Sequence, residues 1–140
     1  TDYLTRSLDL VHHGPYGIRP QGGQGEALGI PVPLFNLVYH DSILIPWDMG
    51  EDGGWGIPKG DAGRLHCLLN AGLPYASLGD PEHIARINEA AALAQRCARL
   101  EMVNHEFLTP DRRTQRTTFA DGTTVTVNFD TKEYEIQPKP

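Results

Sequence analysis

Two neighbouring stretches of the sequence carry side chains that could bind a small polar molecule. His40 and Asp41 follow an apolar run, and Trp47, Asp48 and Trp55 lie in the glycine-rich segment after it. An indole ring offers a flat apolar surface for stacking on a pyranose, and carboxylates are the groups that act on glycosidic bonds and accept hydrogen bonds from sugar hydroxyls. We therefore predict that these five residues contact a carbohydrate substrate.

The same residues have simpler interpretations, which stay open at this point. His40 and Asp41 could satisfy main-chain groups of a loop, Trp47 could anchor that loop, and Trp55 could stand in a turn between glycines. A third interpretation makes His40 and Asp41 a catalytic pair of a small α/β enzyme. Adjacent residues on a strand point to opposite faces, which argues against such a pair.

The elements expected to position these residues alternate between strands and helices. The apolar run over 32–39 predicts a strand buried on both faces, and the segment 42–60 predicts a long loop. A helix is predicted from Asp61 to a terminating Gly72, followed by a strand over 73–78. The next helix is predicted to begin at Pro81 and to run to about Asn104. This order is typical of a parallel sheet covered by helices.

The last thirty residues change character and predict an antiparallel hairpin. The β-rich runs Thr114–Phe119 and Thr123–Phe129 flank Asp121-Gly122, a dipeptide suited to positive φ. The run Thr131–Ile136 offers a third strand. These residues therefore predict a small antiparallel β domain.

Two strands and two helices cannot bury a sheet whose first strand is apolar on both faces, so this unit needs neighbours. They are either other copies of the chain or the remainder of a longer one. We predict an α/β fold in which residues 1–108 are the last two βα units of a (β/α)8 barrel and residues 109–140 start a β-sandwich-like domain. In such barrels the site lies at the carboxyl ends of the strands, where we expect His40 and Asp41.

Composition argues against two classes of partner. The chain has 140 residues with 12 Lys+Arg against 18 Asp+Glu, a net charge of −6, and its basic cluster of Arg112, Arg113 and Arg116 is short. Proteins that bind nucleic acid through its phosphates need more clustered cations. A bilayer span needs roughly 18 to 20 consecutive apolar residues, and the sequence has no such run. We expect neither a nucleic-acid nor a membrane partner.

Metal-ligating residue types occur without the spacing that a metal site needs. Asp48, Glu51 and Asp52 do not match the EF-hand pattern, and the pair at His12 and His13 has no third ligand nearby. We expect no bound metal and no cofactor.

The two cysteines, Cys67 and Cys97, both fall in predicted helices and outside any Cys-x-x-Cys spacing. We interpret them as small buried apolar side chains without a disulfide. The chain begins with Thr1, so we expect that its natural start lies earlier or that a leader has been removed.

Three stretches carry a resemblance to a known family: VPLFNLVYHDSILIPWD (32–48), GDAGRLHCLLNAGLPYASL (60–78) and RTTFADGTTVTVNFDTKEYEI (116–136). They resemble the C-terminal part of bacterial glycoside hydrolases related to the endo-α-N-acetylgalactosaminidase group. The resemblance implies a barrel followed by a β domain whose strands carry an F-x-D-G-T-x-V-x-V-N-F pattern. It also implies an enzyme that hydrolyses glycosidic bonds.

The resemblance places the two catalytic carboxylates on earlier strands, so no nucleophile and no general acid is assigned in this chain. The predicted function is therefore that of a glycoside hydrolase fragment whose substrate contacts include the residues named above. The alternative is a non-catalytic carbohydrate-binding or assembly module, complete at 140 residues and oligomeric.

Overall fold

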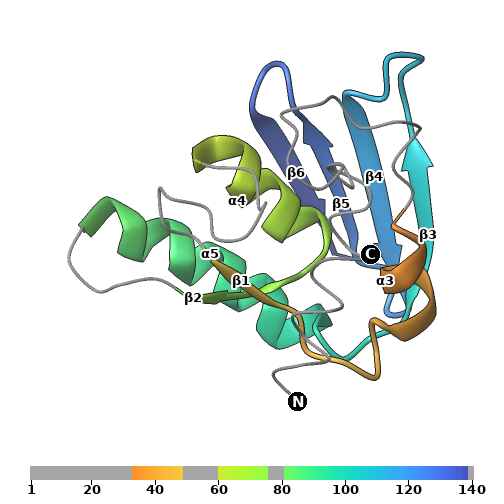
Figure 1. Cartoon of the computed structure of the whole chain (residues 1–140), viewed down its shortest axis with the longest axis horizontal. Helices are drawn as coiled ribbons and strands as arrows, with labels where there is room; N and C mark the ends of the chain where they lie inside the picture. The colour runs from red at the N-terminus through yellow and green to blue at the C-terminus, as the bar shows by residue number, and fades with distance from the viewer. Residues whose placement is uncertain (1–32, 49–59, 76–80, 139–140) are drawn as a thin grey trace, which may run out of the picture.

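The computed structural model describes residues 33–48, 60–75 and 81–138. A four-stranded antiparallel sheet lies on one side of the molecule, and the helices over 60–69 and 81–97 with a short parallel strand pair lie on the other, while the helix over 34–39 lies beside the first strand of the antiparallel sheet (Figure 1). In chain order the elements are α3 (Leu34–Tyr39), β1 (Pro46–Asp48), α4 (Gly60–Leu69), β2 (Leu73–Tyr75), α5 (Pro81–Cys97), β3 (Met102–Phe107), β4 (Thr114–Phe119), β5 (Thr124–Asn128) and β6 (Glu133–Gln137).

The short sheet is parallel, as the alternation of strands and helices predicts. β1 pairs with β2 in the register Pro46↔Leu73, Trp47↔Pro74 and Asp48↔Tyr75. α4 connects the two strands and α5 follows the second, so β1, α4, β2 and α5 form two consecutive strand–helix units. No helix within the described ranges is long and apolar enough to cross a membrane.

The strand predicted over 32–39 is wrong, because residues 34–39 form the helix α3. Pro33, Asn36 and His40 are buried, whereas Leu34 and Val38 are 65% and 57% exposed. This spacing of three and four residues is helical and brings two polar side chains to the inner face. An almost continuous apolar run has no clear period, so the sequence alone did not separate a buried strand from a short helix.

The second correction concerns the end of α5. The helix begins at Pro81, as predicted, but ends at Cys97 instead of continuing to Asn104. Residues 102–107 form β3, which pairs with β4 and carries an irregularity between Met102 and Asn104. His105 therefore lies on a strand and not on a helix.

The C-terminal sheet has the strand order β3-β4-β5-β6 and confirms the predicted hairpin. Gly122 adopts φ 82° in the turn between β4 and β5, a conformation that glycine adopts without steric cost. The Asp121 carboxylate accepts a 2.8 Å hydrogen bond from the main-chain N–H of Thr123. These contacts fix the register of β4 and β5, and β6 pairs next to β5 as the third predicted strand.

One face of the sheet and the helices share a hydrophobic core. β4 alternates strictly between buried and half-buried residues, and its buried Phe119 belongs to the same core cluster as side chains of α4 and α5. β3 lies before the predicted domain boundary at residue 108 and pairs with β4 beyond it, while the division into two domains stays a prediction. The principal core side chains are Leu65, Cys67, Leu68, Leu69, Ala90, Leu93, Cys97, Met102, Phe119, Val125 and Val127.

Candidate functional site

The carboxyl ends of β1 and β2 form the edge at which a parallel sheet presents a ligand site. Asp48 and Tyr75 are register partners and the last residues of their strands. In open α/β sheets and in barrels, ligands bind beyond this edge. Sequence reasoning named Asp48 and missed Tyr75, which the length and register of β2 place beside it.

The two predicted aromatic contacts are Trp47, which belongs to β1, and Trp55, which follows β1 in the sequence. Trp47 is the central residue of β1, and its main chain is registered with Pro74. The side chains of Trp47 and Asp48 are not among those that the structure describes, and Trp55 lies outside the described residues. Their contact with a sugar stays a prediction.

His40 and Asp41 occupy a different place from the one expected. Both precede β1, so they are not at the carboxyl end of a strand. Asp41 is exposed and accepts a 2.9 Å hydrogen bond from the Ser42 hydroxyl. The positional reason for placing these two residues in a sugar site therefore no longer holds.

His40 instead lies in a buried polar cluster beneath α3. Its Nε2 lies 2.7 Å from the carbonyl oxygen of Asn70, and its Nδ1 lies 2.7 Å from that of Leu100. Carbonyl oxygens only accept, and a neutral imidazole carries one N–H, so the tautomer decides which of these two contacts is the hydrogen bond. The ring is 3% exposed and lies 5.1 Å from the ring of Phe119, centroid to centroid.

Two asparagines extend this cluster and complete the connection between α3 and α4. Asn36 Nδ2 donates to Asn70 Oδ1 at 2.6 Å, and Asn70 Nδ2 donates to the carbonyl oxygen of His66 at 2.8 Å. Asn70 stands at the end of α4, where the next residue, Ala71, adopts φ 44°. The cluster thus joins α3, the end of α4 and the segment before β3, which matches the interpretation in which His40 satisfies main-chain groups.

A second polar cluster, which sequence reasoning missed, joins α4, α5 and β6. Arg64 Nη2 donates to Glu89 Oε2 at 2.7 Å and to the Tyr134 hydroxyl at 3.1 Å. The Tyr134 hydroxyl in turn donates to Glu89 Oε1. Burial, followed by the hydrogen bond and charge of Glu89, raises the pKa of Tyr134. The three residues are far apart in the sequence, so no local pattern could have brought them together.

His105 on β3 is a half-buried titratable side chain whose surroundings favour its neutral form. Its Nδ1 lies 3.1 Å from the Thr117 hydroxyl oxygen. Burial lowers the pKa of His105 to about 4, against a smaller opposing effect of Gln115. Among the described residues, no group of three histidine, cysteine, aspartate or glutamate side chains is placed to hold a metal ion.

The solved structures that are similar to this chain include three of alpha-N-acetylgalactosaminidase NagBb from Bifidobacterium bifidum. A quadruple mutant is 39% identical over 83% of this chain, with a TM-score of 0.68. The complex with GalNAc is 37% identical over 81% of this chain, with a TM-score of 0.66, and the ligand-free form is 38% identical over 85%, with a TM-score of 0.66. No protein-family model and no curated protein matches the chain.

The chain spans 19% of the length of each of these three structures. At this level of identity and coverage of our chain, the similarity establishes a relationship to a bacterial glycoside hydrolase, as the resemblance in the sequence indicated. The relatives are named as an alpha-N-acetylgalactosaminidase, so the endo-acting subtype stays a prediction.

Proposed function

We propose that this chain is part of a glycoside hydrolase that cleaves the bond to an α-linked N-acetylgalactosamine residue. The observation that carries the proposal is the 39% identity to alpha-N-acetylgalactosaminidase NagBb across 83% of this chain. The chain spans about a fifth of that enzyme, so the catalytic carboxylates are proposed to lie in other parts of the whole protein.

In this proposal β1, α4, β2 and α5 are the last two strand–helix units of a (β/α)8 barrel. Their parallel pairing and alternating order support that role. Trp47 and Asp48, at the carboxyl end of β1, and Trp55, in the segment after it, are the proposed substrate contacts. His40 is not among these proposed contacts, because it joins α3 to the end of α4 through the main chain of Asn70.

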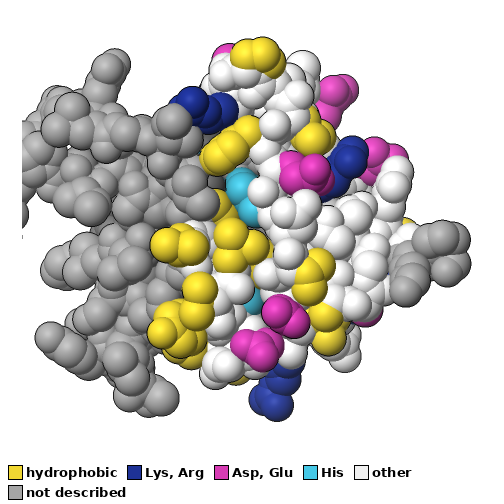
Figure 2. Space-filling model, turned by 90° about the vertical axis from the view of Figure 1, so that its right-hand side faces the viewer, with side chains coloured by type: hydrophobic (Ala, Val, Ile, Leu, Met, Phe, Trp, Pro, Cys, Tyr) yellow, Lys and Arg dark blue, Asp and Glu magenta, His cyan; other side chains and the backbone are white. Residues whose placement is uncertain are grey.

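The remainder of the barrel, or other copies of the chain, would cover the apolar surface around α3. Hydrophobic side chains gather on the face of the molecule that carries α3 and β3 (Figure 2). Monomeric proteins rarely expose a large contiguous patch of hydrophobic side chains, and such patches are typical of surfaces that contact another protein or domain. The exposed ones on these elements and beside them are Leu34, Val38, Tyr39, Leu44, Val103 and Leu108.

The reaction is tested on the protein translated from the whole gene. We expect it to release p-nitrophenol from the α-linked N-acetylgalactosaminide of p-nitrophenol and not from the β-linked one. Hydrolysis of neither compound, together with binding of N-acetylgalactosamine in a calorimeter, would reject this proposal and favour a non-catalytic carbohydrate-binding module.

The substrate contact is tested by replacing Trp47 in the same protein. Trp47→Ala removes the proposed stacking surface and is expected to lower kcat/KM while Tm stays close to that of the wild type. Trp47→Phe keeps a smaller ring and is expected to recover part of the loss. Unchanged kinetics in Trp47→Ala would remove this residue from the site.

A further inference from the structure

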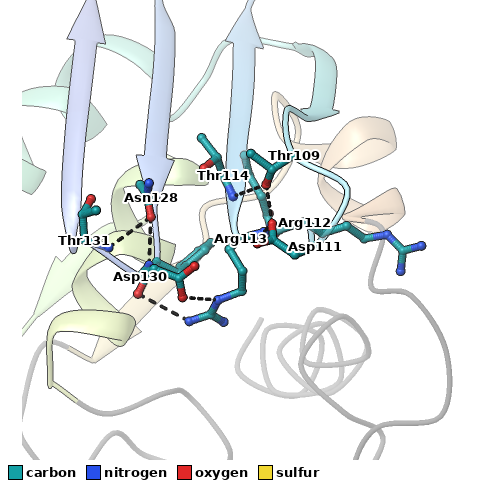
Figure 3. A network of polar contacts seen from close by, with 10 residues as sticks. Thr109, Asp111, Arg112, Arg113, Thr114, Asn128, Asp130 and Thr131 are labelled. Carbon is teal, nitrogen blue, oxygen red and sulfur yellow. Dashed lines mark hydrogen bonds and ion pairs between the residues drawn. The ribbon is translucent and has the colours of Figure 1, made fainter.

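The basic cluster of this acidic chain gathers at one end of the C-terminal sheet. Arg112 and Arg113 lie in the turn between β3 and β4, next to the turn that follows β5 (Figure 3). Arg116 lies on β4 between the buried residues Gln115 and Thr117, so it is on the opposite face of the sheet. Two of the three cations therefore share one corner of the molecule.

A hollow of about 230 Å³ opens at this corner. This volume is below the roughly 300 Å³ at which pockets for drug-sized ligands begin, so it suits a ligand of about one sugar ring. The rings of Phe107 and Phe129 give the hollow apolar walls, and polar groups surround them. Its lining consists of His66, Phe107, Asp111, Arg112, Arg113, Gln115 and Phe129.

The two arginines differ in what they already bind. Arg113 Nε forms a 2.8 Å ion pair with Asp130 Oδ1, so its charge is matched. The Arg112 guanidinium lies 5.9 Å from the centroid of the Phe107 ring and has no ion-pair partner among the residues that the structure describes. In Figure 3 its side chain points away from the network that holds Arg113. The Arg112 guanidinium, which lies against Phe107 and lines the hollow, is therefore available to pair with an anionic ligand.

The turn holds Arg112 in a conformation that costs free energy. Its φ is 60°, in the left-handed region, where a residue with a Cβ is disfavoured by about 1 to 2 kcal/mol. Gln115 Nε2 donates to the carbonyl oxygen of Arg112 at 3.0 Å, and Asp111 Oδ1 accepts from the main-chain N–H of Arg113 at 3.0 Å. Backbone strain that is held in place by surrounding hydrogen bonds is concentrated at ligand sites.

We propose that this hollow binds an acidic monosaccharide, with Arg112 pairing with its carboxylate and Asp111 accepting hydrogen bonds from its ring hydroxyls. The planar guanidinium matches a carboxylate with two parallel hydrogen bonds. Phe107 and Phe129 contact the apolar face of the ring. The site lies on the antiparallel sheet, so it is separate from the edge of β1 and β2 and does not depend on the reaction proposed above.

The experiment is a calorimetric titration of the protein translated from the whole gene at low ionic strength. The probes are glucuronate, glucose, acetate and inorganic phosphate. Glucose has the same ring without the carboxylate, acetate has the carboxylate without the ring, and phosphate is a different anion. We expect glucuronate to bind at least tenfold more tightly than the other three, a difference of about 1.4 kcal/mol.

Two matched variants assign the binding to the hollow. Arg112→Gln is expected to weaken glucuronate binding at least tenfold, whereas Arg116→Gln, on the other face of the sheet, leaves the affinity unchanged. Arg112→Asn serves if the first variant does not fold, because asparagine tolerates positive φ. Absence of glucuronate binding, equal binding by the Arg112 variant, or equal affinity for acetate or phosphate would each overturn the proposal. Binding is measured without turnover, so these outcomes are distinct from a failure to hydrolyse the N-acetylgalactosaminide.

Discussion

Replacing His40 by alanine removes the ring that joins three segments of the fold. The ring makes two contacts of 2.7 Å with the main-chain carbonyl oxygens of Asn70 and Leu100 and is 3% exposed. A hydrogen bond contributes about 1 kcal/mol net, and a buried carbonyl left without its donor costs about 1 to 3 kcal/mol. Loss of packing against Phe119 adds to this, so we expect His40→Ala to lower the free energy of unfolding by about 3 to 4 kcal/mol.

The assay is urea denaturation of the intact protein followed by circular dichroism. With a slope of about 2 kcal/mol per molar urea, a loss of 3 kcal/mol lowers the midpoint by about 1.5 M. His40→Phe keeps an aromatic ring against Phe119 but removes both ring nitrogens, so it isolates the polar contacts of the ring and should lose about 2 to 3 kcal/mol. Asp41→Ala, at the exposed neighbouring position, should change stability by less than about 0.5 kcal/mol.

A wild-type midpoint for His40→Phe would refute this reasoning, because it would mean that the polar contacts of the ring nitrogens contribute nothing to stability. A loss in Asp41→Ala as large as that in His40→Ala would also refute it, since the effect would then belong to the segment and not to the ring.

Three further predictions concern titratable groups and the second polar cluster. The pKa of His105 is held near 4 in the fold against 6.5 in the unfolded chain, so stability should fall as pH decreases from about 6.5 to about 4, and His105→Gln should flatten this part of the denaturation profile. Burial raises the pKa of Cys67 to about 12 and also raises that of Cys97, so neither thiol should react with iodoacetamide at pH 8 before unfolding, as measured by mass spectrometry of the peptides. Tyr134→Phe removes the hydroxyl that joins Arg64 and Glu89 and should lower the free energy of unfolding by about 1 kcal/mol in urea.

Each of these predictions has an outcome that contradicts it. An unchanged pH profile in His105→Gln would show that this histidine does not carry the acid sensitivity. Alkylation of Cys67 in the native protein would show that the core around α4 opens readily. A Tyr134→Phe variant as stable as the wild type would mean that the Tyr134 hydroxyl does not contribute to the free energy of unfolding.

The predicted hairpin was correct because its signals are local. Asp121-Gly122 supplies the positive φ and the side-chain acceptor that the turn needs, and the alternation of Val125 and Val127 with threonines sets which face is buried. The start of α5 at Pro81 was correct for the same reason, since proline fixes the helical φ and needs no donor at the first position.

The wrong predictions came from segments whose conformation depends on distant partners. α3 is a helix because Asn36 and His40 meet Asn70 and Leu100, which lie tens of residues away. β3 was hidden because its irregularity near Val103 leaves that residue 49% exposed and interrupts the two-residue alternation of a strand. The residue pattern within 34–39 or within 102–107 cannot predict these features, because they depend on residues outside each segment.

The candidate site differs from the predicted one because the first strand is at Pro46–Asp48 and not at 32–39. The sequence shows the residue types that are typical of a sugar site. It does not show which of these residues lie at the end of a strand. With β1 at Pro46–Asp48, the carboxyl edge carries Asp48 and Tyr75, and His40 becomes part of the support. The pairing of Asp48 with Tyr75 depends on the register of β1 and β2, which the sequence did not specify.

The core shared by the helices and the sheet limits how genes of this kind can recombine. Leu65 and Leu68 of α4 pack in the same cluster as Phe119, Val125 and Val127 of the sheet. A crossover that joined the sheet of another protein to these helices would pack together two apolar faces whose side chains are not complementary. Protein cores are packed so closely that a change of even one methylene affects stability. The strand–helix units and the sheet are therefore expected to be inherited as a pair, with tolerated breakpoints lying outside the segment that joins α5 to β3.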